Sequence, residues 1–97
     1  MFQIEFTDSA SDDVAWFRKR EQTLITDRIE EQLTHQPNVE TRNRKRLRPN
    51  QIAEWELRVA DYRVFYNVDV NAQTVEITAV VWKIGSRLLA RGEEFQL

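Results

Sequence analysis

Apolar and polar residues alternate with two different periods along this chain, and each change of period marks a new element. Residues 2–6 have the period of a half-buried strand. Apolar residues then recur at helical spacing, which predicts a helix at about 9–19 and a second helix at about 21–35. Ser9 and Asp12 resemble a capping box, so we expect the first helix to begin there.

The second half of the chain has the period of strands. Residues 38–51 show no clean periodicity and contain Asn and Pro, so they are expected to form a loop. Alternation predicts strands at 53–59, 62–68 and 74–82. The tail, 84–97, is expected to be irregular or to add a final edge strand.

This order of elements predicts an α+β fold, β-α-α-β-β-β, in a single domain over residues 1–97. Two N-terminal helices are expected to pack on one face of a mostly antiparallel four-stranded sheet. The chain is 41% hydrophobic and 31% charged, which is typical of a globular domain. It has no cysteine, which excludes a disulfide scaffold and a zinc-thiolate site. Because it has neither a membrane-length apolar run nor a signal-peptide pattern, we expect a cytoplasmic protein without membrane contact.

The segment ELRVADYRVFY, residues 56–66, predicts a hairpin with its turn at Ala60-Asp61. A two-residue turn would place Arg58 directly opposite Arg63. The other face of the hairpin would then be apolar and consist of Trp55, Leu57, Val59, Tyr62, Val64 and Tyr66. Like charges directly opposite on a sheet are destabilising, so either an incoming anion or acidic side chains of this chain must neutralise the two arginines.

A basic cluster between residues 42 and 48 is the sharpest charge feature, with five cations and no acid: Arg42, Arg44, Lys45, Arg46 and Arg48. Each phosphate that such side chains neutralise releases counterions, so the cluster is a candidate RNA-binding segment. A solvated loop or a docking patch for an acidic partner is an equally good interpretation. The net charge of −2 argues weakly against nucleic-acid binding, although the local distribution of charge matters more.

Five side chains around the hairpin and after the last predicted strand are candidates for catalysis: Arg63, Arg58, Lys83, Arg87 and Glu56. Arginine can hold a phosphate or stabilise a phosphoryl-transfer transition state, and a carboxylate such as Glu56 can act as general base. On spacing alone, surface ion pairs with neighbouring acids explain the arginines better. The sequence has no metal-ligand cluster or glycine-rich phosphate loop, so we expect neither a metal nor a small-molecule cofactor.

The run from Trp55 to Asp69, WELRVADYRVFYNVD, resembles the central hairpin of the RelE/ParE toxin superfamily. The preceding Lys45-x-Leu47-x-Pro49 is similar to that family's lysine-leucine element, and the resemblance in length and order covers nearly the whole chain. It implies a small cytoplasmic toxin that is neutralised by a cognate antitoxin encoded beside it. RelE-type members cut mRNA in the ribosomal A site, where the 2′-hydroxyl attacks the adjacent phosphate. ParE-type members inhibit DNA gyrase and lack the nuclease residues.

Residue by residue, the resemblance implies a partial nuclease set. Arg63 matches the family's hairpin arginine at the scissile phosphate, and Lys83 or Arg87 stands for the basic residue after the last strand. Two glutamates take the place of the family's lysines before the hairpin. Leu88 and Leu89 lie where active nucleases carry a Tyr or His.

Three hypotheses follow from this resemblance. The leading one is a type II toxin that inhibits translation by ribosome-dependent mRNA cleavage, with the antitoxin, the ribosome and mRNA as partners. The alternatives are a ParE-like, non-catalytic inhibitor of DNA gyrase and a catalytically degenerate interaction module of the same fold. An acidic antitoxin segment is expected to cover the cationic face that carries Arg58, Arg63, Lys83 and Arg87.

Overall fold

The computed structural model describes residues 1–97 and has the predicted α+β architecture. Its elements are β1 (Gln3–Phe6), α1 (Asp8–Trp16), α2 (Lys19–Leu33), β2 (Arg44–Arg46), β3 (Trp55–Val59), β4 (Tyr62–Asp69), β5 (Thr74–Ile84), β6 (Arg87–Ala90) and β7 (Glu93–Glu94). Two helices therefore precede most of the strands, as the sequence pattern predicts. Neither helix has the length and apolar content needed to cross a membrane.

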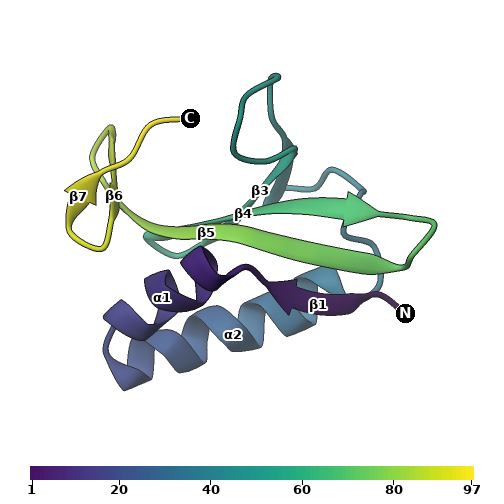
Figure 1. Ribbon diagram of the computed structural model, residues 1–97, viewed down its shortest axis with the longest axis horizontal. Helices are drawn as coiled ribbons and strands as arrows, with labels where there is room; N and C mark the ends of the chain where they lie inside the picture. The colour runs from purple at the N-terminus through teal and green to yellow at the C-terminus, as the bar shows by residue number, and fades with distance from the viewer.

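One mixed sheet contains all seven strands, in the order β2-β3-β4-β5-β6-β7, with β1 beside β5 (Figure 1). The pair of β1 with β5 is parallel, and every other pair is antiparallel. The long strand β5 pairs with β4 along one edge. Along its other edge, its first four residues pair with β1 and its last three pair with β6. The predicted number of four strands is too low, because β2, β6 and β7 are short and lack apolar alternation.

The first helix begins earlier than its expected capping box. Thr7 is the N-cap, and its hydroxyl oxygen accepts a hydrogen bond from the Ala10 N–H at 3.1 Å. The prediction that Ser9 caps this helix is therefore wrong. The helix ends at Trp16 because Phe17 adopts an extended conformation, with ψ at 161°.

The hairpin of β3 and β4 has the predicted register, with Arg58 opposite Arg63 and the turn at Ala60 and Asp61. Ala60 has a φ of 50°. This left-handed conformation costs a residue with a side chain about 1 kcal/mol. The Nη1 atom of Arg63 donates a hydrogen bond to the Ala60 carbonyl oxygen at 2.9 Å, which helps to hold the turn in this shape.

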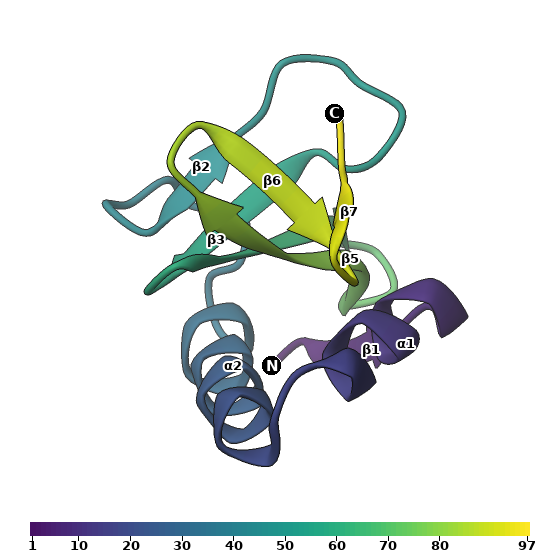
Figure 2. The ribbon, with the colours of Figure 1, turned by 90° about the vertical axis from the view of Figure 1, so that its left-hand side faces the viewer.

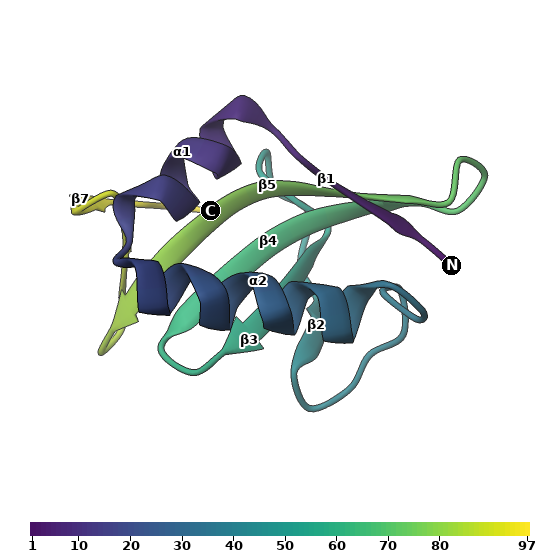
Figure 3. The ribbon, with the colours of Figure 1, turned by 90° about the horizontal axis from the view of Figure 1, so that it is seen from below.

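The two helices cover one face of the sheet, here called the helix face (Figure 3). Ile25, Ile29 and Leu33 of α2 are buried there, in a core of 14 residues. The opposite face, here called the open face, has a smaller core that consists of Ala53, Phe65, Ala79 and Val81. Side chains alternate between the two faces along each strand, so the same strands build both cores.

A β-bulge in β5 allows its apolar residues to fill both faces. Phe65 pairs with Ala79, but the next residue, Tyr66, pairs with Ile77, so Thr78 is the extra residue. The Thr78 hydroxyl donates to the Phe65 carbonyl oxygen at 3.2 Å. Because of the bulge, Ile77 joins the helix-face core while Ala79 joins the open-face core.

Two segments rise above the open face, on the side away from the helices (Figures 1 and 2). They are the connection between β2 and β3 and the β6–β7 hairpin with the C-terminal tail. Phe95 of the tail stacks on Phe65, with ring centroids 5.6 Å apart, and its N–H donates to the Leu88 carbonyl oxygen. The tail thus covers the apolar part of the open face, whereas Arg58, near the Ala60 turn, stays exposed.

Candidate functional site

Charged residues of β2, β3 and β4 meet on the open face. Lys45 lies opposite Glu56 in the β2–β3 pair, and Arg58 lies opposite Arg63 in the β3–β4 pair. The Glu56 carboxylate is 4.0 Å from Nε of Arg63. The structure therefore brings three of the predicted catalytic residues together, with a carboxylate between cations from two neighbouring strands.

Arg63 is the most buried cation of this group, since only 10% of its side chain is exposed. Its Nη1 donates to the carbonyl oxygens of Ala60 and Tyr62 at 2.9 and 2.8 Å. Burial, and then the nearby charge of Arg58, lower the pKa of Arg63 below its ordinary value, but a guanidinium remains protonated in a protein. Nη2 makes no hydrogen bond within the chain.

Lys83 lies on the same open face. It pairs with Leu88, which packs against the open-face core, and its backbone N–H donates to the Asp61 carbonyl oxygen at 2.7 Å. Its Nζ donates to the carbonyl oxygen of Gly85. Lys83 therefore lies beside the hairpin turn, close in the fold to the two arginines.

Arg87 is not part of this group. It pairs with Ile84, one position beyond Lys83, and so projects toward the opposite side of the sheet. Its guanidinium lies 3.5 Å from the carboxylate of Glu94, in an exposed ion pair. The predicted cationic face of four residues is therefore divided, with Arg58, Arg63 and Lys83 on one side and Arg87 on the other.

The basic cluster is also divided, because its centre is the strand β2 and not the expected loop. Arg44 is 9% exposed, and its guanidinium donates to the backbone carbonyl oxygens of Val39 and Gln32 at 3.0 and 2.8 Å. This geometry commits the Arg44 guanidinium to hydrogen bonds within the chain, and its contact with RNA stays a prediction. The other four cations of the cluster are exposed: Arg42, Lys45, Arg46 and Arg48.

Strand alternation sends Lys45 toward Glu56 on the open face, whereas Arg46 lies on the other side, opposite Trp55. The Arg46 guanidinium carbon is 5.6 Å from the centre of the Trp55 ring, a distance at which cation and ring attract. The exposed cations of the cluster thus point in different directions and do not form one stripe.

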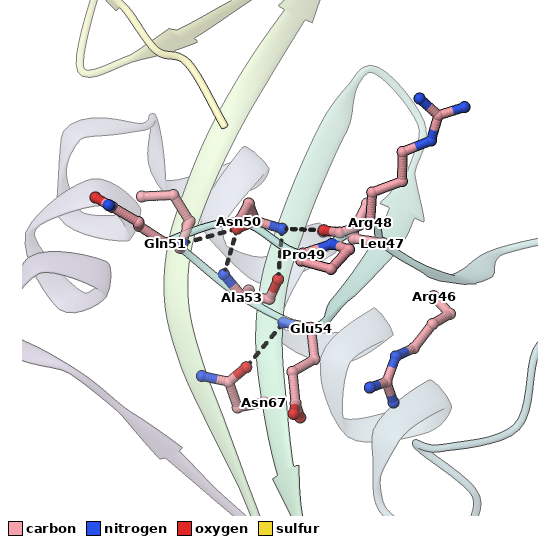
Figure 4. A pocket seen from close by; sticks show the side chains of 10 residues that line it. Arg46, Leu47, Arg48, Pro49, Asn50, Gln51, Ala53, Glu54 and Asn67 are labelled. Carbon is pink, nitrogen blue, oxygen red and sulfur yellow. Dashed lines mark hydrogen bonds between the residues drawn. The ribbon is translucent and has the colours of Figure 1, made fainter.

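A pocket follows the connection between β2 and β3 (Figure 4). The Asn50 side chain organises this loop, since it donates to the carbonyl oxygens of Arg48 and Ala53 and accepts from two backbone N–H groups. Arg46 and Arg48 border the pocket but point away from each other in Figure 4. They do not converge on a single anion, so this pocket is best explained as a by-product of the loop.

A buried carboxylate, not predicted from the sequence, anchors the C-terminal hairpin through a half-exposed arginine. Asp13 of α1 is 2% exposed, accepts the Val80 N–H at 3.0 Å and lies 3.1 Å from Nε of Arg91. Burial raises the pKa of Asp13, against the hydrogen bond from Val80 and the charge of Arg91. Asp13 follows Ala10 by three residues on the buried side of α1, and that position was the available signal.

Comparison with known proteins identifies the family and agrees with the fold. A family model described as the ParE toxin of type II toxin-antitoxin system, parDE, matches residues 4–83. A chain in the crystal structure of the RelBE2 toxin–antitoxin complex from Mycobacterium tuberculosis is 25% identical, with a TM-score of 0.71, over 81% of this chain and 94% of that chain. No curated protein matches the sequence.

Two more distant solved structures share the fold. A chain of the intact Escherichia coli RelBE complex has a TM-score of 0.60 at 16% identity, over 87% of this chain and 98% of that one. A chain of the YoeB–YefM complex from Staphylococcus aureus has a TM-score of 0.62 at 19% identity, over 87% and 97% of the two chains.

Proposed function

This chain belongs to the ParE toxin family of type II toxin–antitoxin systems, within the RelE/ParE superfamily, and we propose that it inhibits translation by cutting mRNA on the ribosome. The observation that carries the proposal is the Glu56 carboxylate beside the ordered Arg63 guanidinium, with Arg58 exposed next to them. A cognate antitoxin, encoded beside the toxin, is the partner that keeps this activity in check.

The proposed reaction needs a base and a cation at one phosphate. Glu56 removes the proton of the ribose 2′-hydroxyl, whose oxygen forms a bond to the adjacent phosphorus. The bond from phosphorus to the 5′-oxygen breaks, and that oxygen takes a proton from water, while the protonated Glu56 gives its proton to the hydroxide that remains. Arg63 and Arg58 stabilise the negative charge that grows on the phosphoryl oxygens. The products are a 2′,3′-cyclic phosphate and a 5′-hydroxyl end, and Glu56 is again a carboxylate.

The test is cleavage of a defined mRNA in a purified translation system. We expect the wild-type toxin to produce 5′-hydroxyl ends on ribosome-bound mRNA, and Arg63→Gln to lower the rate by about a hundredfold, the usual scale for loss of one charge-stabilising group. Arg28→Gln, at an exposed position on α2, is the matched control and should cleave like the wild type. A folded wild-type toxin that leaves ribosome-bound mRNA intact would rule out this function.

Gyrase inhibition is the second candidate, and one specific observation favours it. Leu88 and Leu89, on β6, stand where the resemblance implies a Tyr or His in active nucleases. Without such a group, the open face has no obvious general acid. In a DNA supercoiling assay with purified gyrase, inhibition by the toxin together with intact mRNA in the translation system would select this candidate over the first.

A further inference from the structure

A lysine on the edge strand β2 lies directly opposite the carboxylate that we assign as the base. Lys45 is the cross-strand partner of Glu56, and side chains at such positions have their Cβ atoms about 5 Å apart on one face of a sheet. That face is the open face, because Leu47, two positions after Lys45, packs against the open-face core. Glu56 in turn pairs with Phe65, which belongs to the same core.

Glu56 therefore has a cation on each side. Arg63 of β4 holds its Nε atom 4.0 Å from the Glu56 carboxylate, and Lys45 approaches from β2, on the other side of β3. In the proposed cleavage the attacking 2′-oxygen and the leaving 5′-oxygen are in line, on opposite sides of the phosphorus. A group that protonates the leaving oxygen must reach the same phosphate as the base, and a cation that flanks the base is placed to do so.

The chemistry of the four cations on the open face separates Lys45 from the rest. A guanidinium does not lose its proton in a protein, so Arg58 and Arg63 can stabilise negative charge but cannot act as acids. An ammonium can give up a proton, and the open face has two. The ammonium of Lys83 is two strands away from β3 and donates to the carbonyl oxygen of Gly85. Lys45 is thus the proton donor on the strand next to Glu56.

The Lys45 side chain is also free to meet a substrate. It is exposed, and it forms no ion pair within the chain, not even with Glu56 opposite. Its neighbours on β2, Arg44 and Arg46, project to the other side of the strand and leave Lys45 alone on the open face. A carboxylate and an ammonium that face each other without pairing leave room for a third group between them.

We propose that Lys45 is the general acid of the cleavage reaction, an inference that rests on the proposed function. As the bond from phosphorus to the 5′-oxygen breaks, the Lys45 ammonium gives a proton to that oxygen, and the amine that remains takes one from water. The protonated Glu56 gives its proton to the hydroxide. The proton that the 5′-oxygen takes from water thus passes through Lys45, and the ammonium, the carboxylate and the water molecule are all restored.

The test compares two mRNAs that differ in one atom, with sulfur in place of the 5′-oxygen at the site that the wild type cuts. A thiolate leaves without taking up a proton, since a thiol is a far stronger acid than an alcohol. At saturating ribosome-bound mRNA, we expect Lys45→Gln to cut the oxygen mRNA about a hundredfold more slowly than the wild type, the scale for loss of a general acid. It should cut the sulfur mRNA within about threefold of the wild-type rate, because only the acid is missing.

Two further variants separate proton transfer from charge. Lys45→Arg keeps the positive charge but cannot give a proton, so it should remain as slow as Lys45→Gln on the oxygen mRNA. Lys19→Gln removes an exposed lysine from α2, far from the open face in the fold, and should cut both mRNAs like the wild type.

The outcomes that overturn the inference differ from those that overturn the function. With an active wild type, a Lys45→Gln variant that cuts the oxygen mRNA at the wild-type rate would remove Lys45 from the reaction. An equal loss on both mRNAs, or recovery in Lys45→Arg, would show that Lys45 only holds the phosphate and would also overturn the inference. A folded wild-type toxin that cuts neither mRNA would overturn the proposed function and this inference with it.

Discussion

The two faces of the sheet use the same strands in different ways. The helix face buries a continuous core of 14 residues, whereas the open face combines four buried apolar residues with Lys45, Glu56, Arg58 and Arg63. The first arrangement maximises buried apolar area, and the second keeps charged groups together at some cost in stability. The difference indicates that the helix face maintains the fold while the open face is available for function.

Equivalent leucine truncations on the two faces test this division, and they give the largest expected effect. Leu57 is fully buried in the helix-face core, so Leu57→Ala should lower the free energy of unfolding by about 3 kcal/mol. Leu88 is only partly buried at the open face, and Leu88→Ala should lower it by about 1 kcal/mol. Urea unfolding measures both, and equal losses would mean that the two faces contribute alike to stability.

Arg44 and Arg46, two positions apart on β2, allow a second comparison. Arg44→Gln should lower the free energy of unfolding by about 2 kcal/mol, because it removes charge-assisted, partly buried hydrogen bonds to backbone carbonyl groups. Arg46→Gln should change it by about 0.5 kcal/mol or less, since this side chain is exposed. Thermal unfolding of the two variants decides the matter, and a larger loss for Arg46 would contradict the structural role of Arg44.

Two carboxylates on the helices should respond to pH with opposite signs. Burial raises the pKa of Asp13, so its contribution to stability is present below its ordinary value of 3.8 and is lost as pH rises through the folded-state pKa. The Arg18 N–H and then the Tyr62 hydroxyl lower the pKa of Glu21, so its contribution is present above 4.5 and is lost as pH falls.

Urea midpoints from about pH 3 to pH 6 can separate these two responses. Relative to the wild type, Asp13→Asn should become more stable as pH rises, and Glu21→Gln should lose its relative deficit as pH falls. Parallel profiles for the two variants would contradict the assigned environments.

The smallest expected effect concerns the exposed part of the basic cluster. Replacing Arg42, Lys45, Arg46 and Arg48 with glutamine should weaken binding to a single-stranded RNA and reduce the slope of log K against log salt. Each phosphate contact that is lost should lower the slope by about 0.7. Fluorescence anisotropy over a salt series measures the slope. An unchanged slope would show that these side chains make no contacts with RNA phosphates and are only exposed to solvent.

The sequence predicted those parts of the fold that depend on local alternation. The hairpin register around Arg58 and Arg63 is correct because apolar residues alternate on both sides of Ala60, and the superfamily resemblance is confirmed by the family model over residues 4–83. The strand β2 was missed because its three residues are all charged and carry no apolar period.

The remaining errors concern contacts between distant parts of the chain. Arg44 is buried because Gln32, at the end of α2, supplies acceptors for it, and no local pattern records that contact. The separation of Arg87 from Lys83 depends on the tight β5–β6 turn, in which Ile84 pairs with Arg87. The roles of the predicted catalytic residues stay predictions, since they depend on a substrate.

The most direct test of a functional open face is the mRNA cleavage rate of Glu56→Gln in the purified translation system. This substitution keeps the size of the side chain and removes the proposed base together with its negative charge beside Arg63. We predict a loss of about a hundredfold or more in cleavage rate, the range for removal of a general base, with thermal unfolding close to that of the wild type. A folded Glu56→Gln toxin that cuts ribosome-bound mRNA at the wild-type rate would contradict the claim that this face carries the chemistry.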